Sequence, residues 1–149
     1  MRKFYDRLTA IAALPIMQDL VLLFTRIGLG AIFWQSSRTK VEEGTFLTLS
    51  DTTRFLFQEE YAGVPLPADI AAPMALYAET FLPILLLIGL GTRFAAAGLI
   101  GMTLVIQLFV YPDAWWVPHM GWVALGLVIL TQGAGRLSLD ALIGGKAKA

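Results

Sequence analysis

Four long apolar segments, separated by polar stretches, dominate the chain. They run over about residues 16–35, 70–90, 94–111 and 117–132. A helix needs about 20 apolar residues to cross the hydrocarbon core of a bilayer, and each segment approaches that length, although the third and fourth are short. The pattern predicts an all-α membrane protein: a four-helix transmembrane bundle that forms a single integral membrane domain over residues 1–149.

The longest polar stretch, residues 36–69, joins the first two spans. Within it, SDTTRFLFQEEYAG starts with an N-cap candidate, Ser50, and places Phe55, Leu56, Phe57 and Tyr61 among charged residues. This predicts a short amphipathic helix that lies on the outer face, over the mouth of the bundle. The alternative is a solvated linker.

The first fourteen residues are basic and amphipathic. A signal peptide also begins with basic residues followed by an apolar run. Here Pro15 and Asp19 interrupt that run. We therefore expect residues 1–14 to lie on the membrane surface and not to be a cleaved signal.

Composition supports the membrane assignment and narrows the chemistry. Apolar residues make up 57% of the chain and charged residues 15%, against about a quarter charged in soluble domains. The formal net charge of zero argues against nucleic acid as a partner. The sequence has no cysteine, which excludes disulfides, thiol redox chemistry, thiolate metal sites and covalently attached c-type haem in this chain.

The basic residues predict the orientation. Seven of them fall on one side of the four spans, namely Arg2, Lys3, Arg7, Arg93, Arg136, Lys146 and Lys148. The positive-inside rule therefore places both termini in the cytoplasm and the acidic loops outside. Aromatic residues fall at the outer boundary, as interfacial belts do: Trp34, Tyr111, Trp115 and Trp116.

Two ionisable residues fall inside the spans, and their depths suggest a pair. Arg26 lies roughly 15 Å and Glu79 roughly 16 Å from the cytoplasmic ends of their helices, at 1.5 Å per residue. Pro83 would free the carbonyl of Glu79 from its helical hydrogen bond. Charges within membranes usually pair with one another, so we predict that Arg26 binds both the carboxylate and the freed carbonyl of Glu79.

The role of this predicted pair stays open. It could fix the register of two helices, or it could hold a ligand head group or relay protons. Gln107, in the third span, could extend the polar seam or make an interhelical hydrogen bond only.

A second group of candidates falls at the outer mouth: Lys40, Trp115 and His119, the only histidine. His119 is either an ordinary interfacial histidine or part of a weak outward metal site with Asp113 and Met120, because imidazole and thioether ligands suit copper. We predict no metal site.

Three segments carry a family resemblance: RIGLGAIFWQSSRTK, AETFLPILLLIGLGTRFAA and GAGRLSLDALI. They resemble, in that order, the opening, the second span with its following turn, and the closing segment of the DoxX family of small bacterial membrane proteins. The resemblance covers about residues 20–143, and the positions that match are Arg26, Lys40, Glu79, Arg93 and Asp140. Ser37 stands where the family usually has glycine, so the turn after the first span is expected to differ.

The resemblance implies a bundle in the cytoplasmic membrane of a bacterium and two classes of function. In the first, the chain is an accessory or membrane subunit of a quinone-linked redox or detoxification system, with quinone as the candidate cofactor and a redox protein as partner. In the second, it is a non-enzymatic transporter of a small solute or a scaffold, associated in some relatives with metal handling. No complete catalytic constellation is present in the sequence, and small residues on several helices are compatible with a homo-oligomer.

Overall fold

The structure is a computed structural model that describes residues 2–144. Lys146 and Lys148, counted above among the basic residues, lie outside the described residues. The helices in order are α1 (Arg2–Ala12), α2 (Pro15–Arg38), α3 (Asp51–Glu59), α4 (Ala68–Ile88), α5 (Thr92–Phe109), α6 (Met120–Gln132) and α7 (Leu139–Ile143). A 3-10 turn, η1 (Pro112–Ala114), and a π-helical turn, η2 (Trp115–His119), precede α6.

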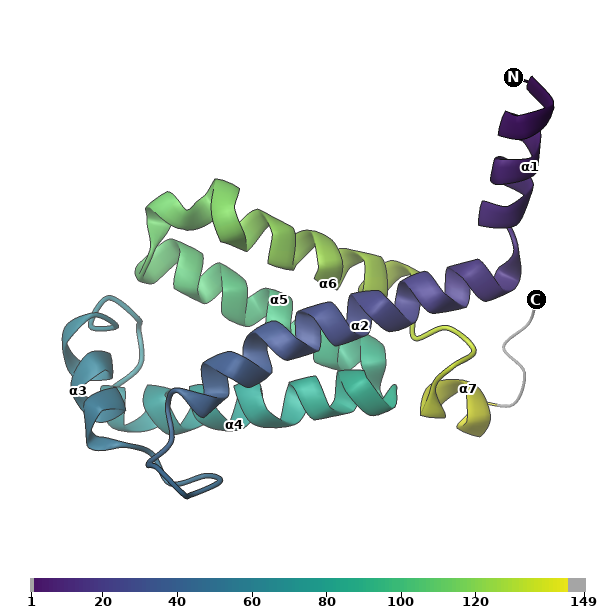
Figure 1. The fold of residues 1–149 in the computed structure, drawn as a ribbon. Coiled ribbons are helices and arrows are strands. Elements are labelled where there is room, and N and C mark those ends of the chain that lie inside the picture. The colour runs from purple at the N-terminus through teal and green to yellow at the C-terminus, as the bar shows by residue number, and fades with distance from the viewer. Residues whose placement is uncertain (1, 145–149) are drawn as a thin grey trace.

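Four segments lie side by side and form the bundle: α2, α4, α5 and the run from η1 to α6 (Figure 1). α2 packs on α4 and α6, and α5 packs on the same two helices, so the four close into a ring. Each is long and apolar enough to cross a membrane. The prediction of an all-α bundle with four spans is confirmed.

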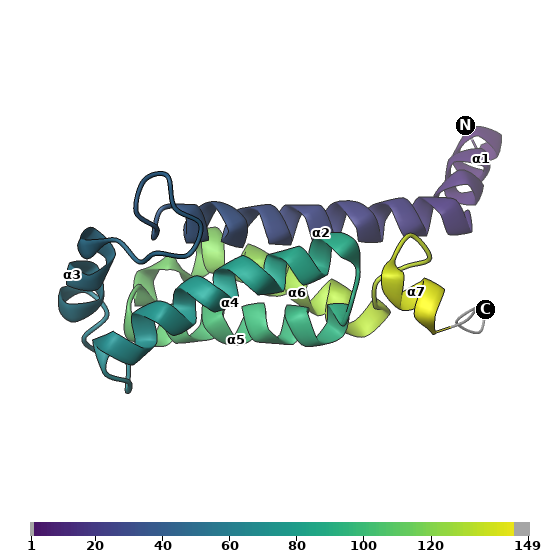
Figure 2. The same cartoon turned by 90° about the horizontal axis from the view of Figure 1, so that it is seen from below.

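The two ends of the bundle differ. α1 and α7, the first and last helices of the described residues, lie at one end, while α3 and its loops lie at the other (Figure 2). We call these the termini end and the α3 end. The helix predicted in the loop between the first two spans is confirmed as α3, which packs on α4. The Ser50 side chain caps it by accepting a hydrogen bond from Thr53 N at 3.2 Å. The alternative of a solvated linker is wrong.

The core and the surface are both apolar, as expected for a protein in lipid. The central cluster includes Leu29, Phe33, Leu86, Leu99 and Ile129, all essentially inaccessible. Large apolar side chains also point outward along the spans, such as Phe24, Phe94 and Leu108, each about 70% exposed. Lipid tails are as apolar as the core, so such side chains carry no cost in a bilayer.

The fourth span differs from its prediction of residues 117–132. The apolar segment begins at Pro112, but its first part is irregular because Pro112 and Pro118 cannot donate backbone hydrogen bonds. Val117 has the extended angles φ −146° and ψ 118°. Regular α-helix starts only at Met120, and His119 therefore sits at the junction of the two parts.

The turn between α4 and α5 depends on Gly89. Its φ of 72° lies in the left-handed region, and a Cβ at this position would overlap the side chain of Arg26 and lie 2.5 Å from Cβ of Ser138. Glycine thus allows the α4–α5 turn to approach α2 and the segment before α7.

Gly89→Ala should lower the thermal unfolding temperature in detergent clearly. Alanine in the left-handed conformation costs about 1–2 kcal/mol before any clash is counted. The matched control is Gly28→Ala in α2, where a Cβ would meet nothing within 4 Å. Equal unfolding temperatures for the two variants would contradict this account of the turn.

Candidate functional site

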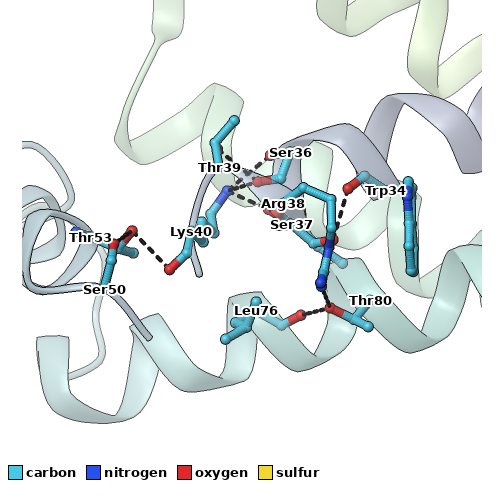
Figure 3. Close-up of polar contacts among 11 residues, drawn as sticks. Trp34, Ser36, Ser37, Arg38, Thr39, Lys40, Ser50, Thr53, Leu76 and Thr80 are labelled. Carbon is cyan, nitrogen blue, oxygen red and sulfur yellow. Dashed lines mark hydrogen bonds and ion pairs between the residues drawn. The ribbon is translucent and has the colours of Figure 1, made fainter. Parts of the chain in front are cut away.

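A buried ion pair, Lys40 with Glu79, lies at the α3 end. Lys40 follows the C-terminus of α2, and its Nζ lies 2.7 Å from Oε2 of Glu79 on α4. The same Nζ donates to Oγ of Ser36 at 2.9 Å and to its carbonyl oxygen at 3.4 Å (Figure 3). Lys40 is 7% and Glu79 2% exposed. Each charge is thus neutralised where the side chain ends, as a nonpolar surrounding requires.

The loop after α2 is held so that Lys40 points inward. The backbone carbonyl of Lys40 accepts hydrogen bonds from Ser50 N at 3.0 Å and from Oγ1 of Thr53 at 3.2 Å (Figure 3). The cap of α3 therefore also fixes the backbone of the lysine. Arg38, two residues earlier, donates to Oγ1 of Thr80 on α4 at 3.0 Å and strengthens the same junction.

A cavity of about 150 Å³ adjoins this ion pair. Residues from α2, α4, α5 and α6, from η2, and from the two loops that follow α3 and α5 line it: Ile32, Phe33, Ser36, Tyr61, Glu79, Ile106, Tyr111, His119 and Trp122. Its walls are mostly aromatic and aliphatic, and its ionisable members are a carboxylate, an imidazole and two phenols. This combination of apolar walls and few polar groups is typical of small-molecule sites.

His119 and Gln107 form the second polar contact of this region. Nδ1 of His119 lies 2.7 Å from Oε1 of Gln107, and Nε2 of Gln107 donates to the carbonyl of Pro112 at 2.5 Å. His119 is 2% exposed, and its ring lies 5.1 Å from that of Trp122. Of the two alternatives given for Gln107, the structure shows the hydrogen bond between helical segments: its partner is His119.

Two tyrosines cover the cavity at the α3 end. The Tyr61 ring stacks on Phe57 of α3 with centroids 4.3 Å apart and meets Tyr111 edge-on at 6.4 Å. The Tyr111 hydroxyl donates to Oε2 of Glu60 at 2.6 Å. Burial raises the pKa of Tyr61 to about 12, so this phenol is neutral throughout the physiological range.

Arg26 belongs to a separate polar network at the termini end. Its guanidinium is fully buried and donates to the carbonyls of Leu86 at 3.1 Å and Leu137 at 2.6 Å. Nε of Arg26 has no hydrogen-bond partner among residues 2–144. Arg26 thus joins α2 to the end of α4 and to the segment before α7.

Asp140 completes this network by capping α5. Its carboxylate accepts from Gly91 N at 2.7 Å and from the amide and hydroxyl of Thr92 at 2.9 and 2.7 Å. Burial would raise the pKa of Asp140, but these hydrogen bonds and the charge of Arg26 outweigh it and lower the pKa below its usual value. Nearby, Asp19 binds Arg136 at 2.6 Å, a pair that the sequence did not suggest.

The predicted pairing of Arg26 with Glu79 is wrong. Helical side chains lean toward the N-terminus of their own helix. α2 begins at the termini end and α4 at the α3 end, so Arg26 and Glu79 lean in opposite directions. Their Cα depths are similar, but Arg26 reaches Leu86, about two turns along α4 from Glu79.

The other candidates are placed as follows. Lys40 and His119 lie at the α3 end as expected, but both are buried inside the bundle and not displayed at its mouth. Trp115 is half-buried in η2 and does not line the cavity. Arg93 donates to the carbonyl of Thr131 at 3.3 Å at the termini end.

Several cavity residues were not singled out from the sequence. Ser36 lies four residues before Lys40, one helical turn away, and that spacing could have suggested their contact. Tyr61 and Trp122 gave no comparable signal, because an aromatic residue in an apolar chain is ordinary. Among the described residues, no group of three or more His, Asp or Glu side chains is arranged to hold a metal ion.

The ion pair can be tested by a double-mutant cycle. Lys40→Met or Glu79→Met alone strands a buried charge, which costs about 3–5 kcal/mol of folding free energy. The double variant should recover most of that loss, measured as the unfolding temperature in detergent. Arg54→Ala is the control, since its 3.9 Å pair with Asp51 is exposed and should contribute little. Additive losses in the double variant would contradict the pairing.

Comparison with known proteins agrees with this architecture. The DoxX family model matches residues 21–112, more than half of the chain. An uncharacterized protein of Haemophilus influenzae is 33% identical over 131 residues, which cover 82% of each chain. No solved structure matches the chain. The chain belongs to the DoxX family.

Proposed function

We propose that this chain is a membrane subunit of a quinone-linked redox or detoxification system and that it binds a quinone head group in the cavity beside Glu79. One observation carries the proposal: the cavity has the size and lining that a single aromatic ring needs. A cavity of about 150 Å³ in another protein accommodates benzene. Aromatic walls suit the faces of such a ring, and the polar groups suit its oxygen substituents.

The surroundings of the cavity favour binding over transport. The apolar cluster around Leu29, Leu86 and Leu99 lies between the cavity and the Arg26 network. A solute path through the bundle would have to cross this cluster, where water finds no polar partners. The arrangement supports a cavity that is closed toward the termini end.

The proposal includes a location and a partner. The seven basic residues counted above support cytoplasmic termini in the bacterial inner membrane, and the α3 end would then face outward. Because the sequence has no cysteine, thiolate-bound redox centres would be supplied by a partner protein. A quinone in the bilayer would connect the two.

Quinone binding can be measured on protein purified with its native lipids. Mass spectrometry of the extracted lipids should detect bound quinone with the unaltered chain. Ile106→Trp should abolish this signal, because Ile106 lines the cavity and an indole there would occupy space that the quinone ring needs. Leu104→Trp, on the same helix but 39% exposed, should retain it.

The outcomes separate the functional classes. Quinone retained equally by the two variants would contradict binding in this cavity. No bound quinone in any sample, and no binding of added quinone, would contradict the proposal and leave the non-enzymatic transporter or scaffold as the better hypothesis.

A further inference from the structure

We infer that the cavity selects the reduced, hydroquinone form of its ring and discriminates against the oxidised quinone. This inference rests on the proposed function and adds the redox state of the ligand to it. The polarity of the hydrogen-bonding groups that line the cavity supports it. The two buried ionisable groups that line the cavity, His119 and Glu79, both present acceptors to it.

The first step fixes the orientation of the Gln107 amide. The carbonyl of Pro112 can only accept a hydrogen bond, so the atom of Gln107 that lies 2.5 Å from it must be the amide nitrogen. The amide oxygen therefore faces His119 at 2.7 Å. That oxygen has no hydrogen to give, so Nδ1 of His119 is the donor.

The other ring nitrogen of His119, Nε2, is an acceptor. A neutral imidazole carries one hydrogen, and with Nδ1 protonated, Nε2 is an acceptor. Burial favours the neutral ring, and the nearby carboxylate of Glu79 is already neutralised by Lys40 at 2.7 Å. Nε2 makes no hydrogen bond within residues 2–144, and His119 lines the cavity.

The third step concerns Glu79. Its Oε2 is taken by Lys40, whereas Oε1 makes no hydrogen bond in the described part of the chain. An ionised carboxylate can only accept, and Glu79 also lines the cavity. Oε1 of Glu79 and Nε2 of His119 are therefore two acceptors that come from different helices and serve one small space.

The remaining hydroxyls do not reverse this polarity. Tyr111 donates its hydrogen to Glu60, and Ser36 and Tyr61 can each either donate or accept. A quinone offers two carbonyl oxygens, which would face acceptors and leave buried polar atoms unpaired. A hydroquinone offers two O–H donors. A site that hydrogen-bonds a hydroxyl rejects the analogue without it strongly, so we expect at least a tenfold difference in Kd.

The experiment compares three para-substituted six-membered rings by calorimetry on the protein in nanodiscs under anaerobic conditions. They are hydroquinone, 1,4-benzoquinone and 1,4-dimethoxybenzene, which keeps both oxygens but has no hydrogen to donate. Hydroquinone should bind at least tenfold more tightly than either of the others. The absence of cysteine removes the thiols with which benzoquinone would react.

Variants test the origin of the preference. His119→Phe keeps a ring but removes the acceptor. It should therefore raise the Kd of hydroquinone about tenfold and leave the Kd of dimethoxybenzene unchanged. A purely structural role of His119 would affect both ligands alike. Gln107→Leu removes the partner that keeps the hydrogen of His119 on Nδ1. This variant should therefore reduce the preference for hydroquinone. Gln132→Leu, an exposed amide at the other end of the bundle, is the control and should keep the full preference.

Two kinds of result would overturn the inference. Equal binding of hydroquinone and benzoquinone, or a preference that survives both His119→Phe and Gln107→Leu, overturns the inference while the proposed quinone site stands. Binding of none of the three rings overturns the inference and the proposed function together.

Discussion

A charge inside a membrane bundle must be neutralised at the tip of its side chain, and the structure follows from how this chain meets that constraint. It does so twice, at opposite ends. At the α3 end, Lys40 closes over Glu79. At the termini end, Arg26 binds carbonyls from the end of α4 and from the segment before α7. Between the two lies the apolar cluster that includes Leu29 and Leu99.

The two networks differ in what surrounds them. The Arg26 network is built mainly from backbone carbonyls and a helix cap. The Lys40–Glu79 network borders a cavity and shares it with His119. The depths of Arg26 and Glu79 in the spans brought the two residues to attention together, but of the two only Glu79 lines the cavity.

Hydropathy was sufficient to predict the bundle because lipid imposes a simple rule on helix length and polarity. The helix α3 was predicted from a local pattern: an N-cap residue, Ser50, followed by aromatic residues among charged ones. The pair of Arg26 with Glu79 failed because depth was counted along the helix axis. An arginine tip lies well away from its Cα, and antiparallel helices send their side chains in opposite directions. The partner of Glu79 came instead from the loop beyond the span, where axial spacing gives no information.

The location of Leu137 has a consequence for how the protein is assembled. Its carbonyl is a partner of Arg26, which precedes it by 111 residues. While the chain is being synthesised, α2 enters the membrane carrying a guanidinium whose partners do not yet exist. Leu86 arrives with α4, but Leu137 and the Asp140 cap arrive only after all four spans have been made. The segment that follows the fourth span thus supplies the last hydrogen-bond partner of a charge that entered the membrane with the first span.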